Sequence, residues 1–386
     1  MTKTHKWQGA ALIVAVLAVA GCSTATPVAD PTSPAPVSSA PATPTSSATP
    51  TPEPVAYERI PTRIPLECDD LLTAEQIATA LGIAASDISP YDNPMSNGRI
   101  GILQAGVLQC NWQSPATEGE DAKYHMTVEV LADAKTEFAE SDLNRKVADL
   151  LGAGSFVRCT NQETIRLCEG EFQVDGYWTT FSFSREPENS AADKDHKPAL
   201  TVGKALRSAL GEAGTPLAPY VIPADALAAW DSCSVLDAKK KIRSALGSPK
   251  LLNPEGDSSH DGNYMLTTLA FDRGGLTSCT WRQNDPYESP TGQVRQFTVR
   301  MIPGAGWAWD EARDDVLEHG QGAELVDVDG ADEAVVSCSS GVDCTLVALV
   351  EDSYVEVVMS FDSDSDRSAS DAAVTAIEFA IERLTA

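Results

Sequence analysis

The feature that most constrains this chain is an internal repeat, in which one ordered set of landmarks occurs twice. Each set runs from a cysteine and a short helical segment through Cys-x-Trp, an alternating strand, an acidic helix, a close cysteine pair and a strand-like run to a closing helix. The opening cysteines are Cys68 and Cys233, and the Cys-x-Trp segments start at Cys110 and Cys279. A shared order with loops of different lengths indicates a duplicated domain.

Hydrophobic periodicity predicts the elements of each copy. Strands alternate apolar and polar residues, whereas helices have apolar residues three and four positions apart. The predicted helices cover 74–81, 134–151 and 199–210 in the first copy, and 238–246, 307–319 and 369–384 in the second. The clearest strands cover 124–130, 177–183, 297–301 and 354–361. Antiparallel strands with helices on one face predict an α+β fold of two tandem domains, and about 160 residues per copy suffice for a core.

Helix-end signals agree with these boundaries. Thr73 and Gln76 have the spacing of a capping box, and Gly82 stands where a left-handed C-cap is expected. In the second copy Asp237 can cap the first helix, and Gly247 followed by Pro249 is a stop signal. The two copies are therefore predicted to cover 58–216 and 217–386.

The nine cysteines predict a disulfide framework with one cysteine left over. Four cysteines per copy allow three connectivities. The close pairs Cys159–Cys168 and Cys338–Cys344 bracket short turns and are expected to staple hairpins. The remaining pairs, Cys68–Cys110 and Cys233–Cys279, would then tie each opening segment to its Cys-x-Trp strand. Metal binding is the weaker alternative, because the sequence has no C-x2-C pair.

The ninth cysteine, Cys22, follows a signal-peptide pattern. Two lysines precede an apolar run from Ala10 to Ala20, which is too short to span a bilayer as a helix. The end of this run, Val19-Ala20-Gly21-Cys22, resembles the bacterial lipobox. That resemblance implies a signal peptide over 1–21, cleavage before Cys22, and lipid on Cys22 that holds the chain on the outer face of a cell membrane.

A stalk is predicted from 22 to 57. Pro, Ser, Thr, Ala and Val make up nearly all of this segment, which cannot bury enough apolar area to offset its conformational entropy. The whole chain has 28 basic and 56 acidic residues, a formal charge of −28. An acidic surface argues against nucleic acid as a partner.

The motifs of the first copy resemble a known family. The run Cys68-Asp69-Asp70-Leu71-Leu72-Thr73-Ala74-Glu75-Gln76, the helix end Ala80-Leu81-Gly82 and the later Cys110-Asn111-Trp112 are similar to the DUF3558 lipoproteins of actinobacteria. The second copy departs from this pattern, with Ser234-Val235-Leu236-Asp237 in place of the double leucine. The resemblance implies a cell-envelope location and a binding role, and it implies no reaction.

No catalytic constellation is evident. The sequence has no G-x-S-x-G, H-E-x-x-H or Walker-type motif, and no histidine recurs at an equivalent position in the two copies. His125 alternates with apolar residues and is expected to face solvent. The spacing of Asp362, Asp364 and Asp366 resembles the start of a calcium loop, but Arg367 occupies the position that requires glycine. Neither this loop nor the acidic loop at 327–330 is preferred over an ordinary turn, so no cofactor is expected.

Aromatic residues offer several candidates for a pocket. Trp112 and Trp281 share a sheet face with their cysteines and are expected in the core. Tyr177 and Trp178 are neighbours in one strand, so one of them is expected to be exposed. Trp307 and Trp309, near a helix start, are expected between helix and sheet rather than in an exposed contact.

Three functions follow from these patterns, in order of preference. The first is a binding module that captures a small envelope ligand or a partner protein. The second is a structural or assembly scaffold for an envelope complex, and the third is a hydrolase with an unrecognised site. A ligand-binding module predicts a cleft with a few convergent polar groups, whereas a scaffold predicts a large exposed apolar patch.

Overall fold

The computed structural model describes residues 60–91, 94–116, 122–140, 150–162, 164–186, 196–224, 226–230, 232–236, 241–248, 250–256, 266–283, 294–339, 343–361 and 369–385. The predicted signal peptide, Cys22 and the predicted stalk lie outside these residues.

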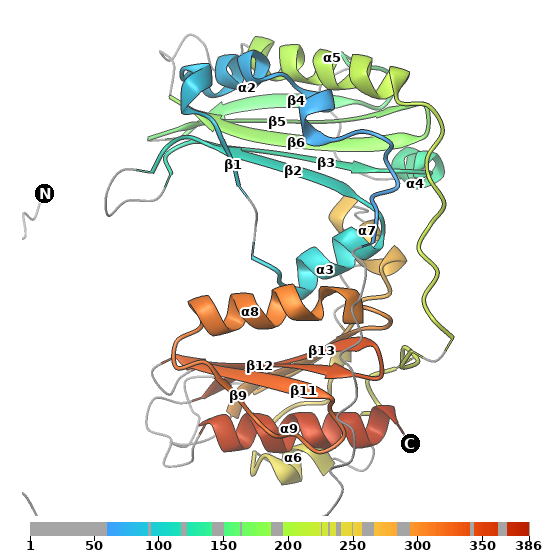
Figure 1. Cartoon of the computed structure of the whole chain (residues 1–386), viewed down its shortest axis with the longest axis vertical. Coiled ribbons are helices and arrows are strands. Elements are labelled where there is room, and N and C mark those ends of the chain that lie inside the picture. The colour runs from blue at the N-terminus through green and yellow to red at the C-terminus, as the bar shows by residue number, and fades with distance from the viewer. Residues whose placement is uncertain are drawn as a thin grey trace, which may run out of the picture. The chain divides into compact units, whose positions relative to one another are not determined.

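The first copy contains an antiparallel sheet. Within the described residues its six strands have the order β1-β2-β3-β6-β5-β4 (Figure 1). Their bounds are β1 Ser89–Pro90, β2 Leu108–Gln113, β3 His125–Leu131, β4 Phe156–Asn161, β5 Arg166–Val174 and β6 Tyr177–Arg185. The predicted alternation in β3 is confirmed, because Met126, Val128 and Val130 are buried.

The second copy repeats this sheet and adds one strand at its edge. Its seven described strands have the order β10-β11-β12-β13-β9-β8-β7, so β7, β8, β9, β13, β12 and β11 correspond to the six strands of the first copy. Their bounds are β7 Glu255–Gly256, β8 Thr277–Arg282, β9 Val294–Ile302, β10 Glu324–Leu325, β11 Glu333–Ser339, β12 Asp343–Val350 and β13 Ser353–Phe361. The fold of two tandem, helix-flanked antiparallel sheets is therefore confirmed.

Each sheet has a core under its own helices. In the first copy these helices are α1 Cys68–Leu71, α2 Ala74–Leu81 and α5 Lys197–Glu212, and in the second they are α6 Lys241–Ala245 and α9 Ala369–Leu384. Figure 1 shows α2 and α5 over one face of the first sheet, and α9 over one face of the second. Ile377 and Ile381 of α9 pack in the second core, as its apolar stripe predicts.

The predicted ends of α2 are confirmed at both termini. Thr73 and Gln76 form the reciprocal bonds of a capping box, and Gly82 is left-handed with φ 74°. The predicted helix over 134–151 is described as α4 over Lys135–Glu140, and its residues 141–149 lie outside the described residues. The acidic helix of the second copy is a 3-10 turn at Gly306–Ala308 followed by α8, Trp309–His319. A further 3-10 turn covers Ala85–Asp87.

A helix of the first copy covers the second sheet, although no pattern in the sequence predicts this contact. This helix, α3 (Asn97–Gln104), precedes β2 in the chain. Its Ile100 is fully buried in an apolar cluster with Trp309 and Tyr354 of the second copy. The face of the second sheet opposite α9 is thus closed partly by α8 and partly by α3.

The equivalent helix of the second copy packs in turn on the first sheet. Helix α7 (Leu266–Arg273) precedes β8, just as α3 precedes β2. Leu266 and Leu269 pack with Phe138 and Trp178 of the first copy, on the face of the first sheet opposite α5. The two copies therefore exchange helices, and Val55–Ala386 form one compact unit.

Glycines let α3 and α7 approach closely where they meet. A Cβ atom on Gly274 would lie 2.2 Å from the carbonyl oxygen of Gly101, and one on Gly98 would lie 3.5 Å from the ring of Phe271. The backbones of the two segments are thus in direct contact, and a side chain at Gly274 cannot be accommodated without moving one of them.

Hydrogen bonds between the two copies are reciprocal, as the packing of α3 and α7 is. Gln104 Nε2 donates to the carbonyl oxygens of Gly274 and Pro303, both at 2.8 Å. Arg273 Nη1 donates to the carbonyl oxygen of Ala132 at 2.7 Å. Pro303 and Ala132 directly follow the equivalent strands β9 and β3, so each copy supplies the same contact to the other.

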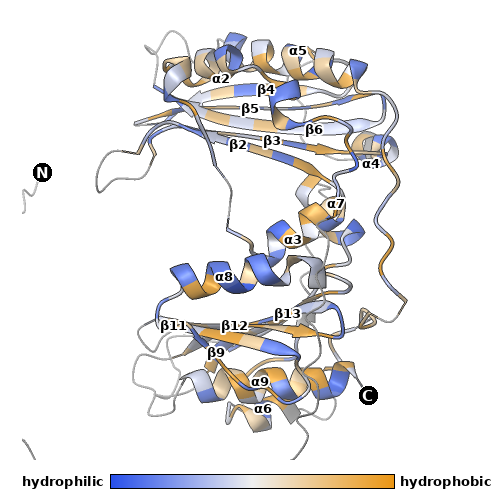
Figure 2. Ribbon diagram, viewed as in Figure 1, coloured by the Kyte–Doolittle hydropathy of each residue, from blue (hydrophilic) through white to orange (hydrophobic). Residues whose placement is uncertain are grey.

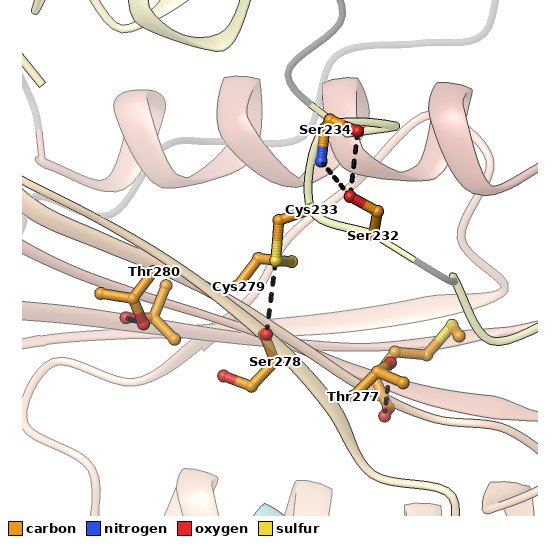
Figure 3. The surroundings of a disulfide bond; sticks show 9 residues. Ser232, Cys233, Ser234, Thr277, Ser278, Cys279 and Thr280 are labelled. Atoms are coloured by element: carbon orange, nitrogen blue, oxygen red, sulfur yellow. Dashed lines mark hydrogen bonds between the residues drawn. A yellow bond between two sulfur atoms is a disulfide. The ribbon is translucent and has the colours of Figure 1, made fainter. Parts of the chain in front are cut away.

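The four predicted disulfides are present. They join Cys68–Cys110, Cys159–Cys168, Cys233–Cys279 and Cys338–Cys344. The close pairs lie directly opposite each other on neighbouring strands, as expected for stapled hairpins. Figure 3 shows the Cys233–Cys279 bond tying the opening segment of the second copy to β8, with Cys233 Sγ 3.6 Å from the carbonyl oxygen of Ser278.

Arg63 joins segments of the first copy to Leu217, the residue that follows this copy, and its removal should be costly. Its guanidinium pairs with Asp133 and donates to the carbonyl oxygen of Leu217 at 3.1 Å, while its stem packs on Gly106. Because charged hydrogen bonds at a buried site are lost, we expect Arg63→Ala to lower the free energy of unfolding by about 3 kcal/mol in urea titrations. Arg158→Ala, which removes an exposed ion pair with Glu169, is the matched control and should change it by less than about 1 kcal/mol. Equal effects of the two substitutions would contradict this role for Arg63.

Candidate functional site

A hollow of about 270 Å³ lies between the start of α3 and helix α8. We call it the α3–α8 hollow. It combines residues of the two copies and is lined by Tyr91, Pro94, Met95, Arg99, Glu311, Asp315 and His319. Because the exchange of helices places α3 on the second sheet, neither copy could form this hollow alone.

The wall from the first copy is held in place by the start of α3. Ser96 is the N-cap, and its hydroxyl accepts a bond from the Arg99 backbone N–H at 3.4 Å. Met95 is 3% exposed and packs in the same apolar cluster as Ile100, whereas Tyr91 is 36% exposed. This wall therefore has a fixed floor and an accessible aromatic ring.

The wall from the second copy is one face of α8. Glu311, Asp315 and His319 follow each other at intervals of four residues, so they lie in a row along the helix. His319 Nδ1 is 3.2 Å from Asp315 Oδ1. Figure 2 shows that hydrophilic residues dominate α8, in contrast to α9. This wall supplies carboxylates next to an imidazole.

Charged residues of the second sheet bind the start of α3. The Glu356 carboxylate accepts bonds from Asn97 Nδ2 at 2.7 Å and from Arg300 Nη1 at 2.8 Å. Glu356 is buried, and this burial raises its pKa despite the opposing effect of Arg300. Burial also raises the pKa of the neighbouring Tyr354 well above its usual range, and the negative charge of Glu356 adds to this shift. Glu356 thus holds the first turn of α3 on the second sheet.

Two carboxyl groups of the second copy should respond to acid in opposite directions. Glu356 has a raised pKa in the folded chain, so it binds a proton more tightly there than in the unfolded chain. Relative to Glu356→Gln, the unaltered protein should therefore gain free energy of unfolding as the pH falls from neutrality through the raised pKa toward 4.5.

Glu333 is the matched comparison. A hydrogen bond from Trp309 and the charge of Arg313 lower its pKa, so its contribution is present above 4.5 and lost as the pH falls through the lowered pKa. Urea titrations over a series of pH values, with Glu333→Gln beside Glu356→Gln, would test both signs. Parallel changes in the two variants would contradict the assignment.

A second hollow, of about 480 Å³, lies beside α9 and has an acidic rim. Asp329, Glu378 and Glu382 line it together with apolar residues that include Phe379 and Ile381. Asp329 belongs to one of the two acidic loops considered for calcium. No group of three metal-ligating side chains occurs among the described residues, and the loop at 362–368 lies outside them.

The predicted aromatic candidates lie in the core rather than in a pocket. Trp112 and Trp281 are buried in the clusters that contain Cys110 and Cys279, as predicted. The expectation that Tyr177 or Trp178 is exposed is wrong, because both are fully buried. Tyr177 lies in the apolar cluster that includes Leu206 and Leu210 of α5, and Trp178 lies in the cluster that includes Leu266 and Leu269 of α7, which comes from the other copy.

The other predicted residues also have defined environments. Trp309 is buried in a cluster with Val335 and Val347 of the second sheet, which confirms the expected helix-to-sheet contact. Trp307 is partly buried and donates to Gln104 Oε1 of α3 at 3.2 Å. His125 is exposed, as predicted. Within the described residues no helix is long and apolar enough to cross a membrane.

Comparisons with known proteins identify no family for this chain. No family model matches it, and no curated protein matches it. One solved structure, the di-domain ARO/CYC StfQ from the steffimycin biosynthetic pathway, is 8% identical, with 77% of this chain and 87% of that chain covered and a TM-score of 0.18. DynU16, from the dynemicin biosynthetic locus, is 10% identical, with 77% and 94% covered and a TM-score of 0.11. Neither structure is similar enough to indicate a shared fold or function.

Proposed function

We propose that this chain is a lipid-anchored protein of the outer face of a cell membrane that binds a small envelope ligand in the α3–α8 hollow. The observation that carries the proposal is a hollow built from both copies, with a fixed apolar floor and several charged groups that converge on it. The lipobox-like segment before Cys22 and the similarity to DUF3558 lipoproteins support the location.

A binding role fits these residues better than hydrolysis does. His319 and Asp315 form a pair of the kind that activates a nucleophile. The described lining of the hollow, however, contains no Ser, Thr, Cys or Lys that the pair could activate. The pair is therefore better suited to holding a ligand than to attacking one.

A scaffold role has less support in the described residues. The large apolar side chains that are exposed there are spread along the chain from residue 91 to residue 325, and three of them lie between 217 and 222. They are Tyr91, Leu150, Leu217, Val221, Ile222, Val235, Leu252, Leu317 and Leu325. A scaffold is expected to present a contiguous patch of several hundred Å² instead.

Ligand screening of the full chain tests the proposed site. We expect compounds from an envelope extract to raise the melting temperature of the unaltered protein, and Tyr91→Ala or Asp315→Asn to abolish this rise. Glu378→Gln, in the second hollow, is the control and should leave the rise unchanged. A ligand whose effect survives both hollow substitutions and is lost in Glu378→Gln would move the site to the second hollow.

The anchor has its own test. Cys22→Ser should move the protein from the membrane fraction to the soluble fraction, with unchanged circular dichroism, because Cys22 is not needed by any of the four disulfides. A Cys22→Ser protein that still sediments with membranes would overturn the proposed lipidation.

A further inference from the structure

We infer that Asn97, at the start of α3, is a site of spontaneous deamidation. The backbone nitrogen of Gly98 displaces the side-chain amide nitrogen as ammonia, and water then leaves an aspartate or an isoaspartate at position 97. This modification acts on the contact between the two copies, and it does not rest on the proposed function. It depends on the groups that surround the Asn97 carboxamide.

Asn97 and Gly98 form the only Asn-Gly pair in the sequence. Deamidation of asparagine begins when the backbone nitrogen of the next residue attacks the side-chain carbonyl carbon. Glycine has no Cβ, so it leaves that approach open and lets the backbone turn toward it. Both residues are partly exposed, so water and a base from the solvent can reach them.

The start of α3 leaves the attacking nitrogen outside the helical hydrogen bonds. The first N–H groups of a helix have no helical acceptor. In α3 the helical bonds begin at the Ile100 N–H, which donates to the carbonyl oxygen of Ser96 at 2.8 Å. Gly98 N lies instead 2.6 Å from Asn97 Oδ1. Because Oδ1 is bonded to the carbon that is attacked, the two reacting atoms are neighbours in the folded chain.

The leaving nitrogen lies next to a carboxyl group. Asn97 Nδ2 donates to Glu356 Oε2 at 2.7 Å, which holds the carboxamide in one orientation. Glu356 is 7% exposed, and this burial raises its pKa although Arg300 opposes the shift. A carboxyl group with a raised pKa keeps a proton more readily near neutral pH. It can therefore give that proton to the nitrogen as the bond to carbon breaks.

The reaction needs water and no other co-reactant. Gly98 N loses its proton to a base from the solvent and forms a bond to Cγ of Asn97, while the bond between Cγ and Nδ2 breaks. Nδ2 takes a proton from Glu356 and leaves as ammonia, and the solvent returns a proton to Glu356. The product of this step is a five-membered succinimide ring. Water then adds to either ring carbonyl carbon and opens the ring, so that water is consumed and ammonia released in equal amounts.

The product should weaken the hold of α3 on the second sheet. A carboxylate replaces the amide donor beside Glu356, so an attractive contact becomes a contact of like charges at a buried site. An isoaspartate also inserts a methylene group into the backbone at the first residue of α3. Ile100, about one turn further along, packs between the copies with Trp309 and Tyr354. Deamidation is therefore expected to loosen the exchange of helices as the protein ages.

Peptide mapping by mass spectrometry tests the site on the full chain after incubation at mildly alkaline pH. We expect Asn97 to convert from amide to acid at least about tenfold faster than Asn111, because Asn111 lies within β2 and precedes a tryptophan. Gly98→Ala should slow conversion at Asn97 by about tenfold or more, because the added Cβ hinders the approach of the backbone nitrogen. This Cβ would lie 3.5 Å from the Phe271 ring, an ordinary contact, so the variant should fold.

Two further variants test the role of Glu356 and the structural consequence. Glu356→Gln keeps an acceptor for Nδ2 but cannot supply a proton, so it should slow conversion at Asn97 by about tenfold or more. Asn97→Asp carries the product of the reaction and should melt at a lower temperature than the unaltered protein. Incubated protein should show the same lower melting temperature in proportion to the fraction that has converted.

The outcomes test each step separately. Equal conversion at Asn97 and Asn111, or conversion at Asn97 that is as fast in Gly98→Ala, would overturn the site. Conversion at Asn97 that is as fast in Glu356→Gln would overturn the role of Glu356 as the proton donor. An unchanged melting temperature of Asn97→Asp would overturn the loosening of the exchange. If Glu356→Gln fails to fold, the comparison with Asn111 and with Gly98→Ala still decides the site.

Discussion

Gly274→Ala should be among the most damaging single substitutions in the chain. Its Cβ would lie 2.2 Å from the carbonyl oxygen of Gly101 and 3.1 Å from that of Ala270, so the obstacle is backbone and not a side chain that can rotate away. We expect the free energy of unfolding, measured by urea titration, to fall by about 3–5 kcal/mol, because overpacking adds to the loss of contacts between the exchanged helices.

Gly211→Ala is the control for this substitution. Gly211 lies in α5, and its nearest neighbour to an added Cβ is Asp175 Oδ2 at 3.8 Å. Alanine is a better helix former than glycine, so this variant should be about 0.5–1 kcal/mol more stable than the unaltered protein. A Gly274→Ala protein that unfolds at the same urea concentration as Gly211→Ala would show that α3 and α7 do not meet as described.

Removing the Cys68–Cys110 disulfide should have the other large effect. The bond closes a loop with a sequence separation of 42, and such a cross-link strongly lowers the conformational entropy of the unfolded chain. On the chain-entropy model its loss in Cys68→Ala/Cys110→Ala should lower the free energy of unfolding by about 4 kcal/mol. Urea titrations under non-reducing conditions, with the other disulfides intact, measure this change.

The comparison with Cys338→Ala/Cys344→Ala makes this prediction specific. That bond closes a separation of only 6, so the same model gives a loss of about 2 kcal/mol. Both pairs have one buried and one partly exposed cysteine, which keeps the packing changes similar. A larger loss for the short loop would show that packing around the sulfur atoms, and not loop length, determines the contribution of these bonds.

Local signals in the sequence predict those helices and strands whose structure depends on residues close by in the chain. The capping box of Thr73 and Gln76 and the left-handed Gly82 define α2 within the sequence itself. Alternation in β3 and β9 marks buried faces without reference to any partner. The disulfides followed from the order of the cysteines in two copies, since the repeat limited the possible pairings.

The exchanged helices could not be found in the same way. Helix α3 contains Asn97, Gly98 and Gly101, which are poor helix formers, and it has no clear apolar stripe because it packs on both sheets. One signal was available in the repeat. Gly106 and Gly275 lie four positions before Cys110 and Cys279, and both are left-handed, as residues that follow a helix often are.

The error at Tyr177 and Trp178 has the same origin. A strand with one covered face must expose alternate residues, and no local signal indicates that the second face of this strand is covered. The helix that covers it belongs to the other copy. The α3–α8 hollow was missed for this reason too, since residues 91–99 and 311–319 become neighbours only through the exchange.

The exchange also determines the order in which the chain can finish folding. Gln104 bonds to carbonyl groups 170 and 199 positions further along the chain. The face of the first sheet opposite α5 is likewise covered only when α7, which starts at Leu266, is in place. Because the chain is synthesised from its N-terminus, the core under α5 can form early. Phe138 and Trp178 stay uncovered until the part of the second copy that contains α7 has also been made. Completion of the first copy is therefore a late event, governed by contacts of high sequence separation, which are slow to form.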